Sequence, residues 1–230
     1  MGTPLLVLAS NSPRRRELLK LGGWNFDTRP ADVDESQRPS EAPQAYVLRL
    51  AESKARTCNE LLTDTGIMPA SEELFILAAD TTVVDGKEVL GKPKDGAEAV
   101  EMLRRLRNRT HQVHTGIAVM RACDGNLRTD LCVTDVPMRD YGDDEIEAYV
   151  ASGDPLDKAG AYAIQHRDFH PVEKMAGCFA SVMGLPLCHL TRSLRQLNIA
   201  PITDIAAECQ SSLDYTCPIS AAVLRGEQVG

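Results

Sequence analysis

The order of apolar segments along the chain is the feature that most constrains its fold. Short apolar runs at residues 5–9 and 74–79 predict buried strands, and residues 44–62 between them predict an amphipathic helix. The apolar positions of that helix are Val47, Leu50, Cys58 and Leu61. The other predicted elements are a hairpin over 83–90 that turns at Asp85 and Gly86, a helix from Asp95 to Leu106, strands over 114–120 and 131–138, and helices over 143–151 and 187–197. This alternation of strands and helices is typical of an α/β sheet covered by helices.

The chain has 230 residues, and neither an internal repeat nor a low-complexity linker divides it. We therefore expect one large domain over residues 1–200. From Pro201 onward the sequence becomes polar and irregular. Residues 203–213 could form one or two turns of helix, but we expect residues 201–230 to be a loosely attached tail of unknown role.

Charge and cysteine content exclude several functional classes. The formal net charge of −8 repels nucleic-acid backbones, so we expect no nucleic-acid partner. No run of eighteen apolar residues is present and residues 1–4 carry no basic region, so we expect neither a membrane span nor a cleaved signal peptide. The seven cysteines are odd in number and form no CxxC pair, which argues against a disulfide framework and a zinc site. A cytoplasmic protein in a reducing compartment fits these features best.

The stretch LASNSPRRRELLKLGG at residues 8–23 places three arginines where a helix least favours them. Ser12 is the predicted N-cap and a proline follows it, so the arginines at 14–16 lie at the positive end of the helix dipole. Each cation there costs roughly 0.3–1 kcal/mol, and more donors cannot satisfy the free backbone N–H groups of that turn. A bound anion would reconcile the arginines with the helix.

Other polar residues also stand where apolar ones are expected, and each has an ordinary alternative explanation. Lys54 lies on the apolar stripe of its helix, where it either extends to solvent or reaches a ligand. Asp80 closes the apolar run of residues 74–79, where a carboxylate either caps a loop or binds a cation or a metal. Lys92 either is a solvated loop residue or binds an anion. Small residues surround Lys158, where they form a tight turn or let the backbone approach a ligand closely.

One kind of ligand would suit all of these residues. Arginines at a helix N-terminus, lysines at Lys54 and Lys92, and carboxylates at Asp80 and Glu35 would together suit a polyphosphate bound with a divalent cation. The sequence contains neither GxxxxGK[ST] nor GxGxxG, so we expect neither a Walker loop nor a dinucleotide fold.

Seven separate segments extend this pattern along the chain. In order they are LASNSPRRRELL near the start, DVDES at 32–36, YVLRLAESKA at 46–55, AADTTVV at 78–84, VLGKP at 89–93, YVASGDPLDKAGAYAIQ at 149–165 and VMGLPL at 182–187. The series resembles the Maf family of nucleoside triphosphate pyrophosphatases, over about residues 5–197. Because seven motifs occur in the correct order, the resemblance is specific.

The resemblance implies a fold and an activity. The implied fold is an elongated α/β structure, with a twisted mixed sheet flanked by helices and a cleft between two lobes, similar to the inosine triphosphate pyrophosphatases. The implied reaction cleaves a nucleoside triphosphate between its α and β phosphates, giving the monophosphate and pyrophosphate with the help of Mg²⁺ or Mn²⁺. Asp80 is implied as the proton acceptor that activates water, and Glu35 joins it at the metal. The implied phosphate-binding residues are Ser10, Arg15, Lys54 and Lys92.

Three pocket positions match the branch of the family that resembles dTTP and UTP pyrophosphatases. They are Arg14 after the Ser-Pro pair, Thr81 after the implied catalytic aspartate, and Gln165 at the end of the segment that contains Lys158. We therefore expect a dTTP and UTP pyrophosphatase. In it, these three residues and Lys158 also bind substrate. Two alternatives stay open, a non-catalytic nucleotide-binding regulator of cell division and an enzyme that removes modified pyrimidine nucleotides. The expected partner is the nucleotide, and a homodimer is left open.

Overall fold

The computed structural model describes residues 4–64 and 74–230, so the expectation about a signal peptide rests partly on residues outside the described ones. Its centre is a mixed sheet with the strand order β2-β1-β3-β5-β6 and with β4 paired to β3. The strands are β1 (Leu5–Leu8), β2 (Phe26–Thr28), β3 (Leu74–Asp85), β4 (Glu88–Leu90), β5 (Thr110–Arg121) and β6 (Leu127–Pro137). β1 is parallel to β2 and β3, whereas β5 is antiparallel to β3 and β6.

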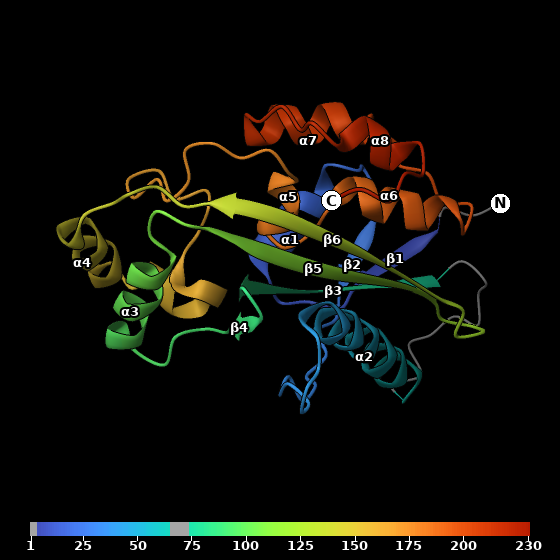
Figure 1. Ribbon diagram of the computed structural model, residues 1–230. Helices are drawn as coiled ribbons and strands as arrows, with labels where there is room; N and C mark the ends of the chain where they lie inside the picture. The colour runs from blue at the N-terminus through green and yellow to red at the C-terminus, as the bar shows by residue number, and fades with distance from the viewer. Residues whose placement is uncertain (1–3, 65–73) are drawn as a thin grey trace.

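Helices cover both faces of the sheet (Figure 1). They are α1 (Pro13–Lys20), α2 (Pro43–Asp64), α3 (Gly96–Leu106), α4 (Asp143–Ala151), α5 (Phe179–Val182), α6 (Leu187–Arg195), α7 (Ile205–Leu213) and α8 (Ser220–Leu224), with short 3-10 helices η1 (Asp154–Asp157) and η2 (Ala159–Ala161). α2 lies on one face, and α6, α7 and α8 lie on the other. No described helix combines the length and the apolarity that a membrane crossing requires.

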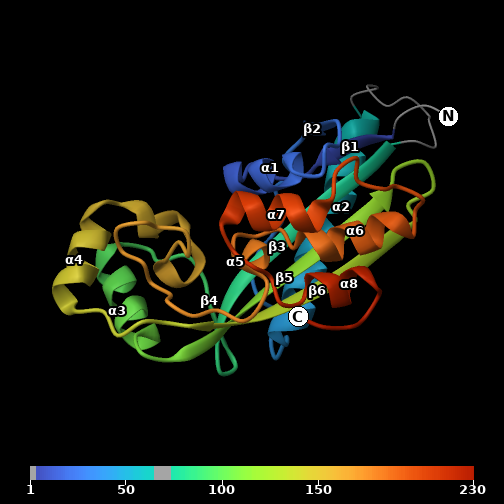
Figure 2. The same ribbon diagram turned by 90° about the horizontal axis from the view of Figure 1, so that it is seen from above.

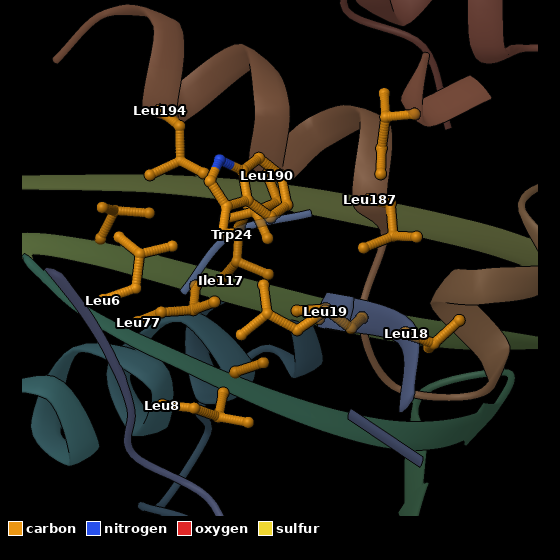
Figure 3. Packing of buried hydrophobic residues seen from close by; sticks show 14 of the residues in the cluster. Leu6, Leu8, Leu18, Leu19, Trp24, Leu77, Ile117, Leu187, Leu190 and Leu194 are labelled. Carbon is orange, nitrogen blue, oxygen red and sulfur yellow. The ribbon is translucent and has the colours of Figure 1, made fainter. Parts of the chain in front are cut away.

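Alternate residues of the central strands fill two cores, one under each helical layer. Leu6, Leu77 and Ile117 face the leucines of α6, in the core that Figure 3 shows from close by. Their neighbours face α2, which approaches β5 very closely. A Cβ on Gly116 would lie only 2.7 Å from the carbonyl oxygen of Val47, so the absent side chain permits this packing.

A third core lies at one end of the elongated molecule, in a lobe made of α3, α4 and the 3-10 helices (Figure 2). Tyr141, Tyr149 and Phe169 pack together there. The long strands β3 and β5 extend from the main body toward this lobe and connect the two parts. The expected twisted mixed sheet flanked by helices is thus confirmed.

Three details of the sequence prediction are wrong. β3 does not end before Asp80 but continues to Asp85, because Asp80 pairs with Gly116 inside the antiparallel ladder with β5. The predicted hairpin forms, but Asp85 pairs with Glu88, so its turn lies one residue later than expected. Leu61 is 37% exposed, and Leu62 takes the buried position at the end of α2.

The C-terminal region is not a loosely attached tail. Ile205 of α7 is 2% exposed and Val223 of α8 is fully buried, and Ile205 belongs to the core under α6. Arg192 of α6, which forms an ion pair with Asp130 of β6, also donates to the carbonyl oxygen of Glu227. The region is therefore part of the folded body, while the division at residue 200 and the role of 201–230 stay predictions.

Candidate functional site

A cleft of about 640 Å³ lies between the main body and the end lobe. The loop after β1, the start of α1, α2 and the segment that follows α4 all contribute to it. Every predicted site residue except Asp80 lines it: Ser10, Arg14, Arg15, Glu35, Lys54, Thr81, Lys92, Lys158 and Gln165. Asp80 is not among the lining residues, but its carboxylate contacts Lys54, which is one of them.

The start of α1 is built as the sequence predicts. Ser12 has an extended backbone, and its hydroxyl oxygen accepts a hydrogen bond from the Arg15 N–H at 3.4 Å. Pro13 occupies the first turn, and no acidic residue lies there to offset the helix dipole. Arg16 is exposed and is not among the residues that line the cleft, whereas Arg14 and Arg15 are.

The Arg15 guanidinium is held on three sides. Its Nε donates to the carbonyl oxygen of Gly184 at 2.9 Å, and its two terminal nitrogens donate to Ser10 Oγ at 3.3 Å and Thr81 Oγ1 at 3.2 Å. All three partners are neutral oxygens, and burial lowers the pKa of Arg15 against the opposing charge of Asp80. The hydrogen bonds therefore fix the direction of the guanidinium but do not neutralise its charge.

Gly184 shapes this arrangement. Its φ of +113° lies in the region that favours glycine, and a Cβ there would be 3.3 Å from Arg15 Nε. Thr81 also contacts Thr115, whose hydroxyl donates to the carbonyl oxygen of Ser181. Thr81 therefore orients the arginine in the structure, in addition to lining the cleft.

Lys54 joins two carboxylates. Its Nζ lies 2.7 Å from Asp80 Oδ1 and 2.5 Å from Glu35 Oε1. The Lys54 and Asp80 side chains are 11% and 10% exposed, whereas that of Glu35 is 54% exposed. The sequence placed Lys54 on the apolar face of its helix, and the structure explains this position, because Asp80 lies on the sheet face that α2 covers.

The two carboxyl groups differ in acidity. Burial raises the pKa of Asp80, although the charges of Lys54 and Arg15 oppose the rise. Burial also acts to raise the pKa of Glu35, but the hydrogen bond and charge of Lys54 outweigh it, so the net pKa is lowered. Asp80 is thus the stronger base of the two, and perturbed carboxyl groups in a cleft are typical of functional sites.

The loop that carries Glu35 is held by two residues that sequence reasoning missed. Tyr46 donates its hydroxyl hydrogen to the carbonyl oxygen of Glu35 at 2.7 Å. Arg49, one turn later on α2, binds both oxygens of Glu41 and the carbonyl oxygen of Ser36. Their spacing of three residues on the same helix as Lys54 was the available signal, because it places them near one face.

The remaining predicted residues differ in their exposure and in their ion pairs. Lys92 and Gln165 both line the cleft and are both exposed. Lys158 lines the cleft, but its Nζ binds the carboxylates of Asp154 at 3.0 Å and Asp157 at 2.6 Å. Its ammonium is therefore already neutralised by its own loop.

The cleft contains an excess of unneutralised cations. Among the described residues, Arg14, Arg15 and Lys92 form no ion pair with a carboxylate. Two of these cations stand at the N-terminus of α1, where backbone N–H groups and the helix dipole also attract an anion. The arrangement can bind a polyanion of several phosphates, with a buried basic carboxylate beside it.

The donors in the cleft also fit a hard divalent cation. In residues 4–64 and 74–230, no three His, Cys, Asp or Glu side chains are grouped as a ready metal site. Mg²⁺, however, commonly binds to one or two carboxylates and takes further oxygens from substrate phosphates. Glu35 and Asp80 supply carboxylates of this kind on one side of the cleft, since both contact the same ammonium group.

Comparison with known proteins agrees with the geometry. The family model described as Maf-like protein matches residues 5–197. A dTTP/UTP pyrophosphatase of Anaeromyxobacter dehalogenans is 47% identical over 195 residues, which cover 84% of this chain and 94% of that protein. A dTTP/UTP pyrophosphatase of Hahella chejuensis is 43% identical over 198 residues, which cover 86% of this chain and 94% of that protein. Among solved structures, a HAM1 protein from Coxiella burnetii matches with a TM-score of 0.42 and 20% identity, over 60% of this chain and 74% of that one.

Proposed function

The chain belongs to the family of Maf-like proteins, and from this premise we propose that it is a nucleoside triphosphate pyrophosphatase acting on dTTP and UTP. It is a hydrolase of the phosphoanhydride bond between the α and β phosphates. The observation that carries the proposal is the cleft, in which cations without carboxylate partners lie next to a buried aspartate of raised pKa. The names of the relatives supply the nucleotide class.

The cations hold the triphosphate. Arg15 presents a guanidinium fixed by three hydrogen bonds, so little side-chain entropy is lost when it binds phosphate oxygens. Arg14 and the backbone N–H groups of the first turn of α1 add further donors. Lys92 supplies a mobile positive charge at the edge of the cleft, where the outer phosphates have access to it.

Asp80 accepts the proton of the attacking water. The water oxygen bonds to a phosphorus of the α–β bridge, the bridging P–O bond breaks, and the water proton passes to Asp80. Its raised pKa makes the ionised carboxylate a better proton acceptor than an exposed aspartate. Lys54 fixes the direction of the carboxylate through its 2.7 Å contact.

A divalent cation is part of the proposal. Glu35 and Asp80 would hold it together with substrate oxygens, since carboxylates are the ligands that Mg²⁺ and Mn²⁺ prefer. When bound, such an ion neutralises charge on the phosphates and lowers the pKa of a bound water. Lys54 balances both carboxylates before the substrate arrives.

Base recognition is assigned to Gln165. Its amide offers one donor and one acceptor group, which matches the N3–H and O4 edge that uracil and thymine share. It lines the same cleft as Arg14 and Arg15, so one nucleotide can contact all three. The extra methyl group of thymine costs little where no contact excludes it.

A pyrophosphate-release assay tests the proposal. Purified protein is incubated with UTP, dTTP, ATP, GTP, 7-methyl-GTP and modified pyrimidine triphosphates, with Mg²⁺, with Mn²⁺ and with a chelator. We expect metal-dependent release of pyrophosphate and monophosphate from UTP and dTTP. Tight binding of UTP without release at any metal concentration would instead support the non-catalytic regulator of cell division.

We also propose a cytoplasmic location and a homodimer. A cytoplasmic location agrees with the seven free thiols of the chain, because secreted proteins of this cysteine content usually form disulfides. A homodimer stays a prediction, which the mass of the protein in solution tests directly.

A further inference from the structure

Four cysteines from separate segments meet at one small cavity beneath α7. The cavity measures about 10 Å³, and the cysteines that line it are Cys178, Cys188, Cys209 and Cys217. Two of them, Cys209 and Cys217, come from the C-terminal region beyond the 5–197 match to the family. A space of this size holds at most about one water molecule.

Two thiols have an acidity that depends on Cys178: Cys217, and Cys132 in β6. Of these two, Cys217 is the one that lines this cavity together with Cys178. The chain around Cys217 is also anchored to the residue before Cys178, since Tyr215 donates to the carbonyl oxygen of Gly177 at 2.9 Å. The Cys217 Sγ lies 4.0 Å from the same oxygen. The Cys217 sulfur is thus held beside the backbone that leads into Cys178.

Cys217 differs from Cys178 and Cys132 in its exposure to solvent. Cys217 is half-buried, whereas Cys178 is 6% exposed and Cys132 is fully buried. The hydrogen bond from Cys178 and the backbone N–H groups of Ile219 and Ser220 lower the pKa of Cys217. Cys217 is therefore the thiol of the three that a small oxidant can reach, and it has thiolate character.

We propose that Cys217 and Cys178 form a peroxide-responsive disulfide that joins the segment before α8 to the start of α5. The Cys217 thiolate attacks hydrogen peroxide, forms a sulfenic acid and releases hydroxide, which takes up a proton to become water. Cys178 then attacks the sulfenic sulfur, forms the S–S bond and releases the second water. Two thiols lose two electrons and two protons, and peroxide is reduced to two waters.

The other cysteines that line the cavity are poorer nucleophiles toward peroxide than Cys217. Burial raises the pKa of Cys188 to about 12 and that of Cys209 to about 11, so neither supplies a thiolate at neutral pH. Cys209 is half-buried, as Cys217 is, and therefore serves as a matched control. In a reducing compartment such a disulfide would be transient, as is usual for intracellular redox-sensing cysteines.

Peptide mapping by mass spectrometry tests the proposal. The full chain is reduced, freed of reductant, exposed to hydrogen peroxide and alkylated. We expect two of the seven thiols to become protected, one cross-linked peptide pair that contains Cys178 and Cys217, and full reversal by dithiothreitol. Because the bond closes a long loop, the thermal midpoint of the oxidised protein should rise by about 5–10 °C.

Matched variants separate this pair from its neighbours. Cys217→Ser and Cys178→Ser should abolish the cross-link and the rise in midpoint, while Cys209→Ser should leave both unchanged. The half-exposed Cys217→Ser is the decisive variant if Cys178→Ser folds poorly. A cross-link between Cys132 and Cys178, persistence of the protected thiols in Cys217→Ser, or oxidation of Cys217 to sulfinic acid without a cross-link would overturn the proposal.

Discussion

The buried contact between Lys54 and Asp80 allows a quantitative test of the electrostatics of the cleft. Lys54→Met keeps the length of the side chain but removes the ammonium that lies 2.7 Å from the carboxylate. Both side chains are about nine-tenths buried, so solvent does not replace the lost partner. Removing one member of such a pair typically costs about 3–5 kcal/mol of folding free energy, because a charge is left uncompensated.

Protonation of Asp80 sets an upper limit on this cost. Converting an aspartate of ordinary pKa, about 3.9, to its neutral form costs about 4 kcal/mol at pH 7 and about 1.5 kcal/mol at pH 5. We therefore expect Lys54→Met to lose about 3–4 kcal/mol at pH 7 and about 1.5 kcal/mol at pH 5. The sign of this pH dependence follows from Asp80, because burial raises its pKa in the folded state. The stability that its protonation contributes is fully present below the unfolded-state pKa and is lost as the pH rises through the folded-state pKa.

Urea denaturation of four proteins measures this effect at both pH values: the wild type, Lys54→Met, Asp80→Asn and the double variant. Asp80→Asn should be nearly neutral, because Lys54 keeps Glu35 as a partner at 2.5 Å. The double variant should recover most of the loss of Lys54→Met. Arg56→Met on the same helix, whose ion pair is exposed, should change stability by less than about 0.5 kcal/mol. Equal losses at pH 5 and pH 7, or additive single effects, would refute the reasoning.

Three further predictions follow from the site and the core. Arg15→Ala should weaken pyrophosphate binding by about 10–100-fold, whereas Arg16→Ala should change it by less than about twofold, because of the two only Arg15 lines the cleft. The thermal shift at millimolar pyrophosphate measures both variants, and equal effects would contradict this assignment. Ile205→Ala should cost about 2–5 kcal/mol in urea denaturation, since Ile205 is 2% exposed, while Ile202→Ala at a 72% exposed position should cost less than about 0.5 kcal/mol. UTP and dTTP should be hydrolysed with similar kcat/KM and GTP about 100-fold less efficiently, and a protein that prefers GTP would show that Gln165 does not select the base.

Much of the cleft was predictable because its residues violate local rules. Arginines at a helix N-terminus, a lysine on an apolar stripe and a carboxylate after an apolar run are each costly alone. The residues that violate these rules lie together: all the predicted site residues except Asp80 line one cleft, and Asp80 contacts Lys54. The roles of these residues in binding and catalysis stay predictions.

What the sequence did not reveal depends on long-range contacts. The position of Asp80 inside β3 follows from its pairing with Gly116, which lies 36 residues further along the chain. The C-terminal region looks like a tail because its apolar residues follow no regular pattern that the sequence prediction could use, yet two of them, Ile205 and Val223, are buried. The ion pairs of Lys158 were missed for a different, local reason: they form within its own loop, whose turn cannot be deduced from composition.

The central claim is that Asp80 is the base of a pyrophosphatase, and Asp80→Asn tests it most directly. The amide keeps the shape of the side chain but cannot accept the water proton. We predict that pyrophosphate release from UTP falls by about 10²–10⁴-fold, while UTP binding, measured by calorimetry with metal present, stays within about tenfold. Asp80→Asn protein that releases pyrophosphate at a rate close to the wild type would contradict the account and make Glu35 the next candidate for the base.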